Sequence, residues 1–93
     1  MKNEKIYKRA WKTFGKDKQL DMIIEECSEL IKEVCMLKRE RNVYFNKIVE
    51  EMADVEIMNE QFRCVYDLEG LYSYYKRKKL DRLERRLNEF DKN

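Results

Sequence analysis

Apolar side chains recur along this chain at intervals of three and four residues, the spacing that places them on one side of an α-helix. The longest run predicts a helix over residues 18–39. Three further runs predict helices over residues 3–14, 46–66 and 71–90. The positions that define the longest helix are Leu20, Ile23, Ile24, Cys27, Leu30, Ile31, Val34 and Leu37.

Polar residues and glycines at the ends of these runs predict where the helices begin and end. Asn3, Asp17 and Asn46 are candidate N-caps, because a short polar side chain can accept hydrogen bonds from the first free amides of a helix. Gly15 is suited to close the first helix, and Gly70 is typical of a turn before the last one.

Four amphipathic helices bury their apolar sides most simply in an antiparallel bundle. We therefore expect one all-α domain over residues 1–93, built as an antiparallel helical bundle of about four helices. The third helix also carries apolar residues outside its main stripe, which indicates burial on two sides. We expect this second strip to complete the bundle by homo-oligomerisation, as a homodimer or tetramer. It consists of Val49, Ala53, Ile57 and Cys64.

Composition narrows the class of protein further. The 93 residues include no proline and two glycines, too few turn residues for an all-β fold. Histidine is absent, which excludes Cys/His zinc sites and histidine-based triads. Three cysteines at no metal-binding spacing favour reduced thiols and a cytoplasmic protein. A net charge of +2 does not require a nucleic-acid partner, and no apolar run is long enough to predict a membrane span.

Two acidic clusters depart from the pattern of a solvated helix surface. Each places carboxylates on one helical turn, where like charges repel, and neither contains a lysine or arginine. At about 100° per residue, Glu51 falls between Met58 and Phe62, inside the apolar side of its helix. The clusters are Glu25, Glu26 and Glu29, and Glu50, Glu51 and Asp54.

Carboxylates near a bundle interior need a compensating charge, because an unpaired buried charge is costly. Carboxylate oxygens from two helices are ligands that Mg²⁺ or Mn²⁺ prefers, and helix bundles commonly build metal sites in this way. The alternative is that these acids form ion pairs with the many lysines and arginines of the chain. The pattern leaves both interpretations open.

The order of these acids resembles the signature of MazG-like nucleotide pyrophosphohydrolases, all-α enzymes with ExxE and ExxD motifs on successive helices. Here Glu26-x-x-Glu29 is followed, after 21 residues, by Glu51-x-x-Asp54. The surrounding segments IIEECSELIKEV and IVEEMADVEIM also resemble the family's two motif helices. The likeness covers roughly residues 10–65 well and the last helix loosely.

The resemblance implies an activity and a set of residues. Family members hydrolyse nucleoside triphosphates, or their deoxy forms, to the monophosphate and pyrophosphate with Mg²⁺, and Mn²⁺ is a possible substitute. By resemblance, the metal ligands would be Glu26, Glu29, Glu51 and Asp54. A carboxylate near the metal can orient the attacking water, and Glu25 or Glu50 could take this role or could simply be solvated. Lys79 and Arg86 resemble the basic pair with which the family holds phosphate, and the alternative for them is a solvated basic surface. Leu83 stands where the family has an asparagine.

Two other functions fit parts of the sequence. The related phosphoribosyl-ATP hydrolases carry an aromatic-His pair after the second motif, whereas this chain has no histidine. A non-catalytic helical dimerisation module could bind nucleic acid through the basic fourth helix, although this does not explain the position of Glu51. Trp11, Phe14, Tyr44 and Phe45 could each stack on a base, and the sequence assigns none of them to that role.

Overall fold

A computed structural model describes residues 1–39 and 45–92 of the chain. Over these residues it contains four helices and no strand: α1 (Glu4–Phe14), α2 (Lys16–Lys38), α3 (Phe45–Val65) and α4 (Glu69–Asp91). The all-α prediction is confirmed. None of the four helices, within the described ranges, has the length and apolar character that a membrane crossing requires.

The helix ends agree with the predicted ranges to within about two residues but use different caps. Gly15 closes α1 with a φ of 91°, and α2 begins at the next residue, so Asp17 lies in the first turn instead of capping it. Asn3 precedes α1 without a side-chain cap hydrogen bond, and Asn46 lies inside α3. The turn before α4 is centred on Asp67, with a φ of 56°, while Gly70 is helical.

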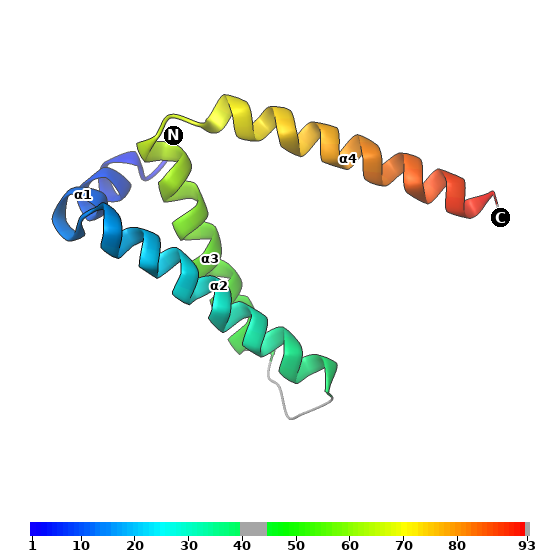
Figure 1. Cartoon of the computed structure of the whole chain (residues 1–93), viewed down its shortest axis with the longest axis horizontal. Helices are drawn as coiled ribbons and strands as arrows, with labels where there is room; N and C mark the ends of the chain where they lie inside the picture. Colours follow the sequence, from blue (N-terminus) through cyan, green and yellow to red (C-terminus); the bar gives the residue numbers. More distant parts are fainter. Residues whose placement is uncertain (40–44, 93) are drawn as a thin grey trace.

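Helices α1, α2 and α3 pack together as the body of the molecule, with α2 and α3 antiparallel (Figure 1). Tyr7 of α1 is buried against α3, and its hydroxyl donates a hydrogen bond of 3.0 Å to Glu60. The Trp11 ring meets the rings of Phe62 and Tyr66 edge-on, with centroids 6.3 and 5.5 Å away. These contacts fix α1 across the C-terminal half of α3.

Helix α4 does not complete the predicted bundle within its own chain. It contacts α3 only where the two helices join, and from that elbow it projects away from the body (Figure 1). The radius of gyration is 16.8 Å, whereas a compact chain of this length has about 12 Å. Arg63 anchors the elbow, because its Nε donates to Glu69 at 2.6 Å and its guanidinium lies 3.8 Å from the centre of the Tyr72 ring.

Candidate metal centre

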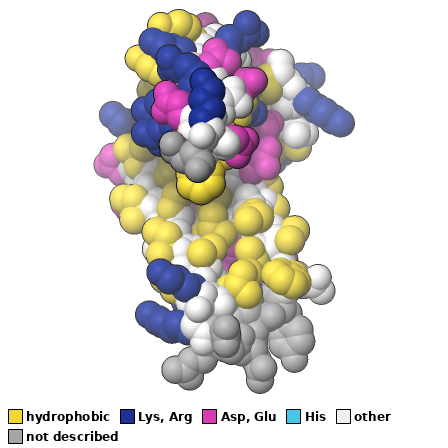
Figure 2. Space-filling model, turned by 90° about the vertical axis from the view of Figure 1, so that its right-hand side faces the viewer, with side chains coloured by type: hydrophobic (Ala, Val, Ile, Leu, Met, Phe, Trp, Pro, Cys, Tyr) yellow, Lys and Arg dark blue, Asp and Glu magenta, His cyan; other side chains and the backbone are white. Residues whose placement is uncertain are grey.

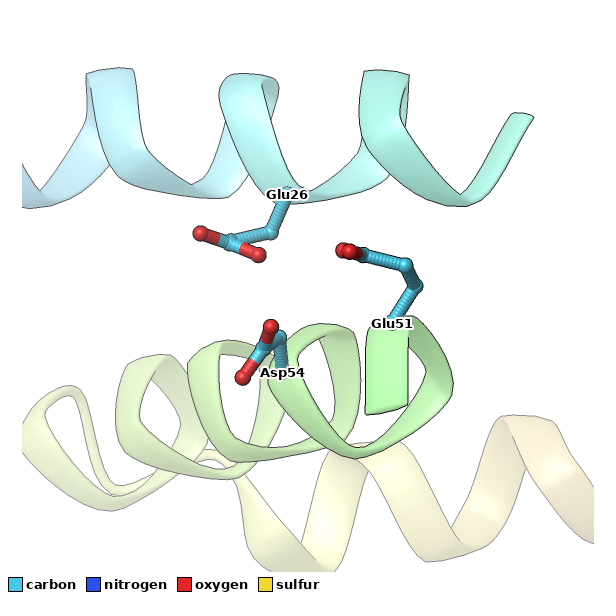
Figure 3. Close-up of side chains that lie close together, drawn as sticks. All are labelled: Glu26, Glu51 and Asp54. Carbon is cyan, nitrogen blue, oxygen red and sulfur yellow. The ribbon is translucent and has the colours of Figure 1, made fainter. Parts of the chain in front are cut away.

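The α2–α3 pair brings three of the predicted carboxylates together. Glu26 extends from α2, and Glu51 and Asp54 extend from neighbouring turns of α3. All three side chains lie in the space between the two helices (Figure 3). One oxygen from each lies within 4.8 Å of the others. Glu51 and Asp54 share one side of α3 because they are three residues apart. Antiparallel packing of α2 then places Glu26 opposite them.

These three carboxylates differ in exposure and in their partners. Glu51 is only 5% exposed, Glu26 is half-buried and Asp54 is exposed. The Lys47 ammonium, one turn before Glu51 on α3, lies 3.2 Å from a Glu51 oxygen and is itself half exposed. Within the described residues, this is the one ion pair made by the three acids. The cluster therefore holds more negative charge than its ion pair neutralises.

The excess charge is visible in the pKa of Glu26. Burial raises this pKa above its ordinary value, and the charge and hydrogen bond of Asp54 and the charges of Glu51 and Glu25 raise it further. In the protein without a cation, burial and repulsion thus favour the protonated form of Glu26. A divalent cation would take the place of that proton.

The donor set fits a hard divalent cation. Given Mg–O distances near 2.1 Å, one pair of the three oxygens can lie about 4.2 Å apart on opposite sides of an octahedral Mg²⁺ ion and the other pairs lie about 3.0 Å apart. Oxygens that lie within 4.8 Å of one another must therefore move closer together around the ion. Side-chain rotation of exposed Asp54 can supply that movement. Three carboxylates leave the other positions of an octahedral ion for water, a fourth side chain or a phosphate.

The remaining acidic candidates lie close to the cluster but outside it. Glu29 is half-buried, one turn beyond Glu26 on α2, and its oxygens are not among those that meet. Glu25 and Glu50 are exposed neighbours of Glu26 and Glu51 in sequence. Their role, like that of Glu29 as a ligand, stays a prediction.

Lys79 and Arg86 are not brought to the carboxylates within one chain. Both are exposed on α4, which meets α3 only at the elbow. Across residues 1–39 and 45–92, no ion pair joins α4 to the acidic cluster. Lys79 instead lines a shallow groove on α4 together with Tyr75 and Leu83.

Two residues near the cluster were missed by sequence reasoning. Lys47 lies four residues before Glu51, so the i, i+4 rule for helical ion pairs signals it. Glu33 is only 7% exposed. It stands seven residues after Glu26, which places it on the same side of α2 and signals a third inward carboxylate on that helix. The charge of Glu33 contributes to the raised pKa of Lys47, after the larger contributions of Glu51 and Glu50.

The aromatic residues considered for base stacking have varied surroundings in the structure. Trp11 packs against Phe62 and Tyr66 within the body. Phe14 and Phe45 are exposed, and Tyr44 lies outside the described residues. None of them is assigned to a substrate.

The raised pKa of Glu26 predicts how stability depends on pH in metal-free protein. Between the unfolded and the raised folded pKa, the folded state binds more protons, so stability falls as the pH rises through this interval. Glu26→Gln removes this penalty and is expected to raise the melting temperature at pH 7 in EDTA. The difference should shrink as the pH falls toward 4, because Glu26 then becomes increasingly protonated in both states.

A thermal melt followed by circular dichroism across pH 4–7.5 measures this effect. The exposed neighbour Glu25→Gln serves as the matched control and should change stability less at pH 7. A Glu26→Gln variant less stable than the wild type at pH 7 in EDTA would contradict the raised pKa of Glu26.

Comparison of the chain with protein-family models, with curated proteins and with solved structures finds no match. The likeness to MazG-like enzymes therefore rests on the two motifs and their surroundings.

Proposed function

We propose that this protein is a Mg²⁺-dependent nucleoside triphosphate pyrophosphohydrolase. The observation that supports it best is the meeting of Glu26, Glu51 and Asp54 between α2 and α3. These are three of the four acids that the resemblance singles out. The raised pKa of Glu26 adds support, because it indicates a cluster that lacks positive charge. Glu29 is the proposed fourth ligand.

The proposed reaction is attack of water on the α–β phosphoanhydride, which yields a nucleoside monophosphate and pyrophosphate. When bound, Mg²⁺ offsets the negative charge of the phosphate oxygens and makes the attacking water more acidic. A carboxylate at the edge of the cluster, Glu25 or Glu50, orients the water and accepts its proton. Glu51 is held by its helix in a nearly water-excluded position, where its charge acts most strongly.

Phosphates that extend beyond the metal need further positive charge. Lys79 and Arg86 are the proposed donors by resemblance, and both lie on α4, away from the carboxylates of their own chain. Lys47 is already beside Glu51 and is the nearest ammonium to the cluster that the described residues provide. It is therefore an additional candidate for a phosphate contact.

A pyrophosphate-release assay over the common ribo- and deoxynucleoside triphosphates tests this proposal. We expect release of pyrophosphate and monophosphate with millimolar Mg²⁺ and none with EDTA. Release of inorganic phosphate alone would indicate cleavage at the γ position and contradict the proposal. Absence of pyrophosphate release from every nucleotide, with either Mg²⁺ or Mn²⁺, would refute the proposed activity.

The exposed basic helix favours a second candidate, a non-catalytic module that binds nucleic acid through α4. Residues 76–86 carry seven basic and two acidic side chains, all exposed. On this alternative Lys78, Lys79, Arg85 and Arg86 would contribute about equally, each lowering the salt dependence of binding by about one unit when removed. On the enzyme proposal Lys79 and Arg86 affect KM or kcat, whereas Lys78 and Arg85 point elsewhere around the helix.

Millimolar Mg²⁺ provides a rapid way to separate the two candidates. Binding to the folded state raises the melting temperature, by an amount that grows with the ratio of ligand concentration to Kd. We expect Mg²⁺ to raise the melting temperature of the wild type and to leave the melting temperature of Glu51→Gln nearly unchanged. An equal response of the two proteins would contradict a site at Glu51.

A further inference from the structure

The fourth helix exposes an apolar stripe that its own chain leaves uncovered. The stripe consists of Leu80, Leu83, Leu87 and Phe90, which are between 51 and 77% exposed. On α2, a second uncovered strip consists of Ile24, Cys27, Ile31 and Val34. Ile24 and Ile31 are 67 and 62% exposed. We call these the α4 stripe and the α2 strip.

The two surfaces have the same spacing along their helices. In each, the four residues follow one another at intervals of three, four and three. This is the spacing at which side chains of one helix fit between those of another in a coiled-coil seam. Helices α2 and α4 each have 23 residues, which makes each about 34 Å long. The stripe and the strip therefore match in both period and length.

The space between α4 and the body is open and apolar. Next to the elbow lies a groove of about 580 Å³, whose lining includes Leu20 and Ile24 of α2, Phe62 of α3, and Tyr72 and Tyr75 of α4. Figure 2 looks into this open side and shows hydrophobic side chains gathered between α4 and the far end of the α2–α3 pair.

The exposed area is large enough to require a partner. The chain has 8207 Å² of accessible surface, whereas a folded monomer of its mass has about 5,800 Å². The excess of about 2,400 Å² falls in the range that each subunit of an obligate dimer buries. Only Tyr7, Ile48 and Met58 form a buried apolar core within the described part of the chain.

Charge indicates which surfaces meet. Residues 76–86 are strongly basic, while α2 and α3 together carry eleven acidic and six basic residues. Contact between two α4 helices would place basic side chains against basic ones. Contact of α4 with the α2–α3 pair instead brings a basic surface to helices of net negative charge.

We propose that two copies of this chain form a dimer with two equivalent contacts, in which the α4 stripe of each copy packs on the α2 strip of the other. The arrangement is self-complementary, so a two-fold axis generates both contacts. The proposal does not depend on the proposed enzymatic function. The four strip residues lie about 80–160° around α2 from Glu26, so the strip and the acidic cluster occupy different sides of α2.

Light scattering after size exclusion tests the dimer. For the wild type at 10 µM we expect twice the 11.6 kDa mass of the chain, or a multiple of that dimer. Leu83→Glu on the stripe and Ile31→Glu on the strip should each reduce the mass to that of one chain. Asn88→Glu and Lys18→Gln, which make the same charge change elsewhere on α4 and α2, should remain dimeric.

Disulfide trapping tests the same contact without a destabilising charge. In a Cys35→Ser, Cys64→Ser background, Cys27 stays on the α2 strip. Leu87→Cys should form a covalent dimer with Cys27 if the helices meet antiparallel, and Leu83→Cys if they meet parallel. Asn88→Cys and the background without an added cysteine should not. Absence of a covalent dimer with both Leu83→Cys and Leu87→Cys would overturn the proposal.

A monomeric wild type would also overturn it. If that monomer bound vesicles containing phosphatidylserine through α4, the amphipathic basic helix would instead be a membrane-surface element. The net negative charge of α2 and α3 favours a second copy over an anionic bilayer as the cover of the α2 strip.

Discussion

Replacing Glu51 with glutamine is expected to lower the rate of pyrophosphate release at least about 100-fold, the scale on which removal of one preorganised charge acts in a transition state. Glu51 is 5% exposed and lies with Glu26 and Asp54, so its charge is poorly screened by water. Glutamine keeps the shape of the side chain and removes the charge that a cation needs.

The loss of activity should not arise from unfolding. Glu51 loses its ion pair with Lys47 in this variant, but the Lys47 side chain is half exposed. Pairs of this kind contribute at most about 1 kcal/mol. Glu56→Gln is the matched control, because Glu56 is exposed on the same helix and lies about 140° away from Glu51. Activity of Glu51→Gln within tenfold of the wild type would exclude Glu51 as a ligand.

Periodicity predicted the helices because each one carries a stripe long enough to define its own axis. The stripe of α2 alone set its range, and the structure places that helix at Lys16–Lys38. Cap positions were less predictable, since Gly15 closes α1 and opens α2 at once. A single glycine with a positive φ joins the two helices and leaves no separate position for a capping side chain such as Asp17.

The direction of α4 could not be predicted from the sequence. An apolar stripe shows that a helix needs a cover, but it does not say whether the cover comes from the same chain. Arg63, through Glu69 and Tyr72, holds the start of α4 in a specific elbow. That contact depends on the path of the turn at Asp67, and helix periodicity carries no information about a turn.

The candidate site was predictable where acids share an apolar side with core residues. The position of Glu51 between Met58 and Phe62 on the helical wheel indicated burial, and the structure confirms it. On the wheel, Glu26 borders the apolar side of α2 and Glu29 lies further round, and the structure brings Glu26, not Glu29, to Glu51 and Asp54. Which α3 residues Glu26 meets depends on the register between α2 and α3, which a pattern on one helix does not contain.

A buried pair of glutamines helps to set this register. Gln19 of α2 and Gln61 of α3 are 5 and 4% exposed, and the Gln19 amide donates to the Gln61 oxygen at 2.6 Å. Seven residues, about two helical turns, separate Gln19 from Glu26 on α2. The same number separates Asp54 from Gln61 on α3. The glutamine contact and the Glu26–Asp54 contact therefore belong to one antiparallel alignment of the two helices.

Replacing only Gln61 with leucine is expected to lower the free energy of unfolding by about 1–3 kcal/mol, because the buried Gln19 amide loses its partner. Replacing both glutamines with leucine should recover most of that loss, since no unpaired polar group is left. Urea unfolding of the wild type, both single variants and the double variant measures the coupling between the two residues. Single losses that simply add in the double variant would show that the two side chains do not act as a pair.

The double variant also separates stability from alignment. Two leucines can slide against each other, whereas two amides hold a donor and an acceptor at fixed positions, so a polar pair can specify register at the cost of stability. We expect the double variant to fold with near-normal stability and to show a smaller Mg²⁺-induced rise in melting temperature than the wild type. The effect would reflect poorer alignment of Glu26 with Glu51 and Asp54, two turns away. A full Mg²⁺ response in the double variant would mean that packing around Ile48 and Met58 is enough to align the carboxylates.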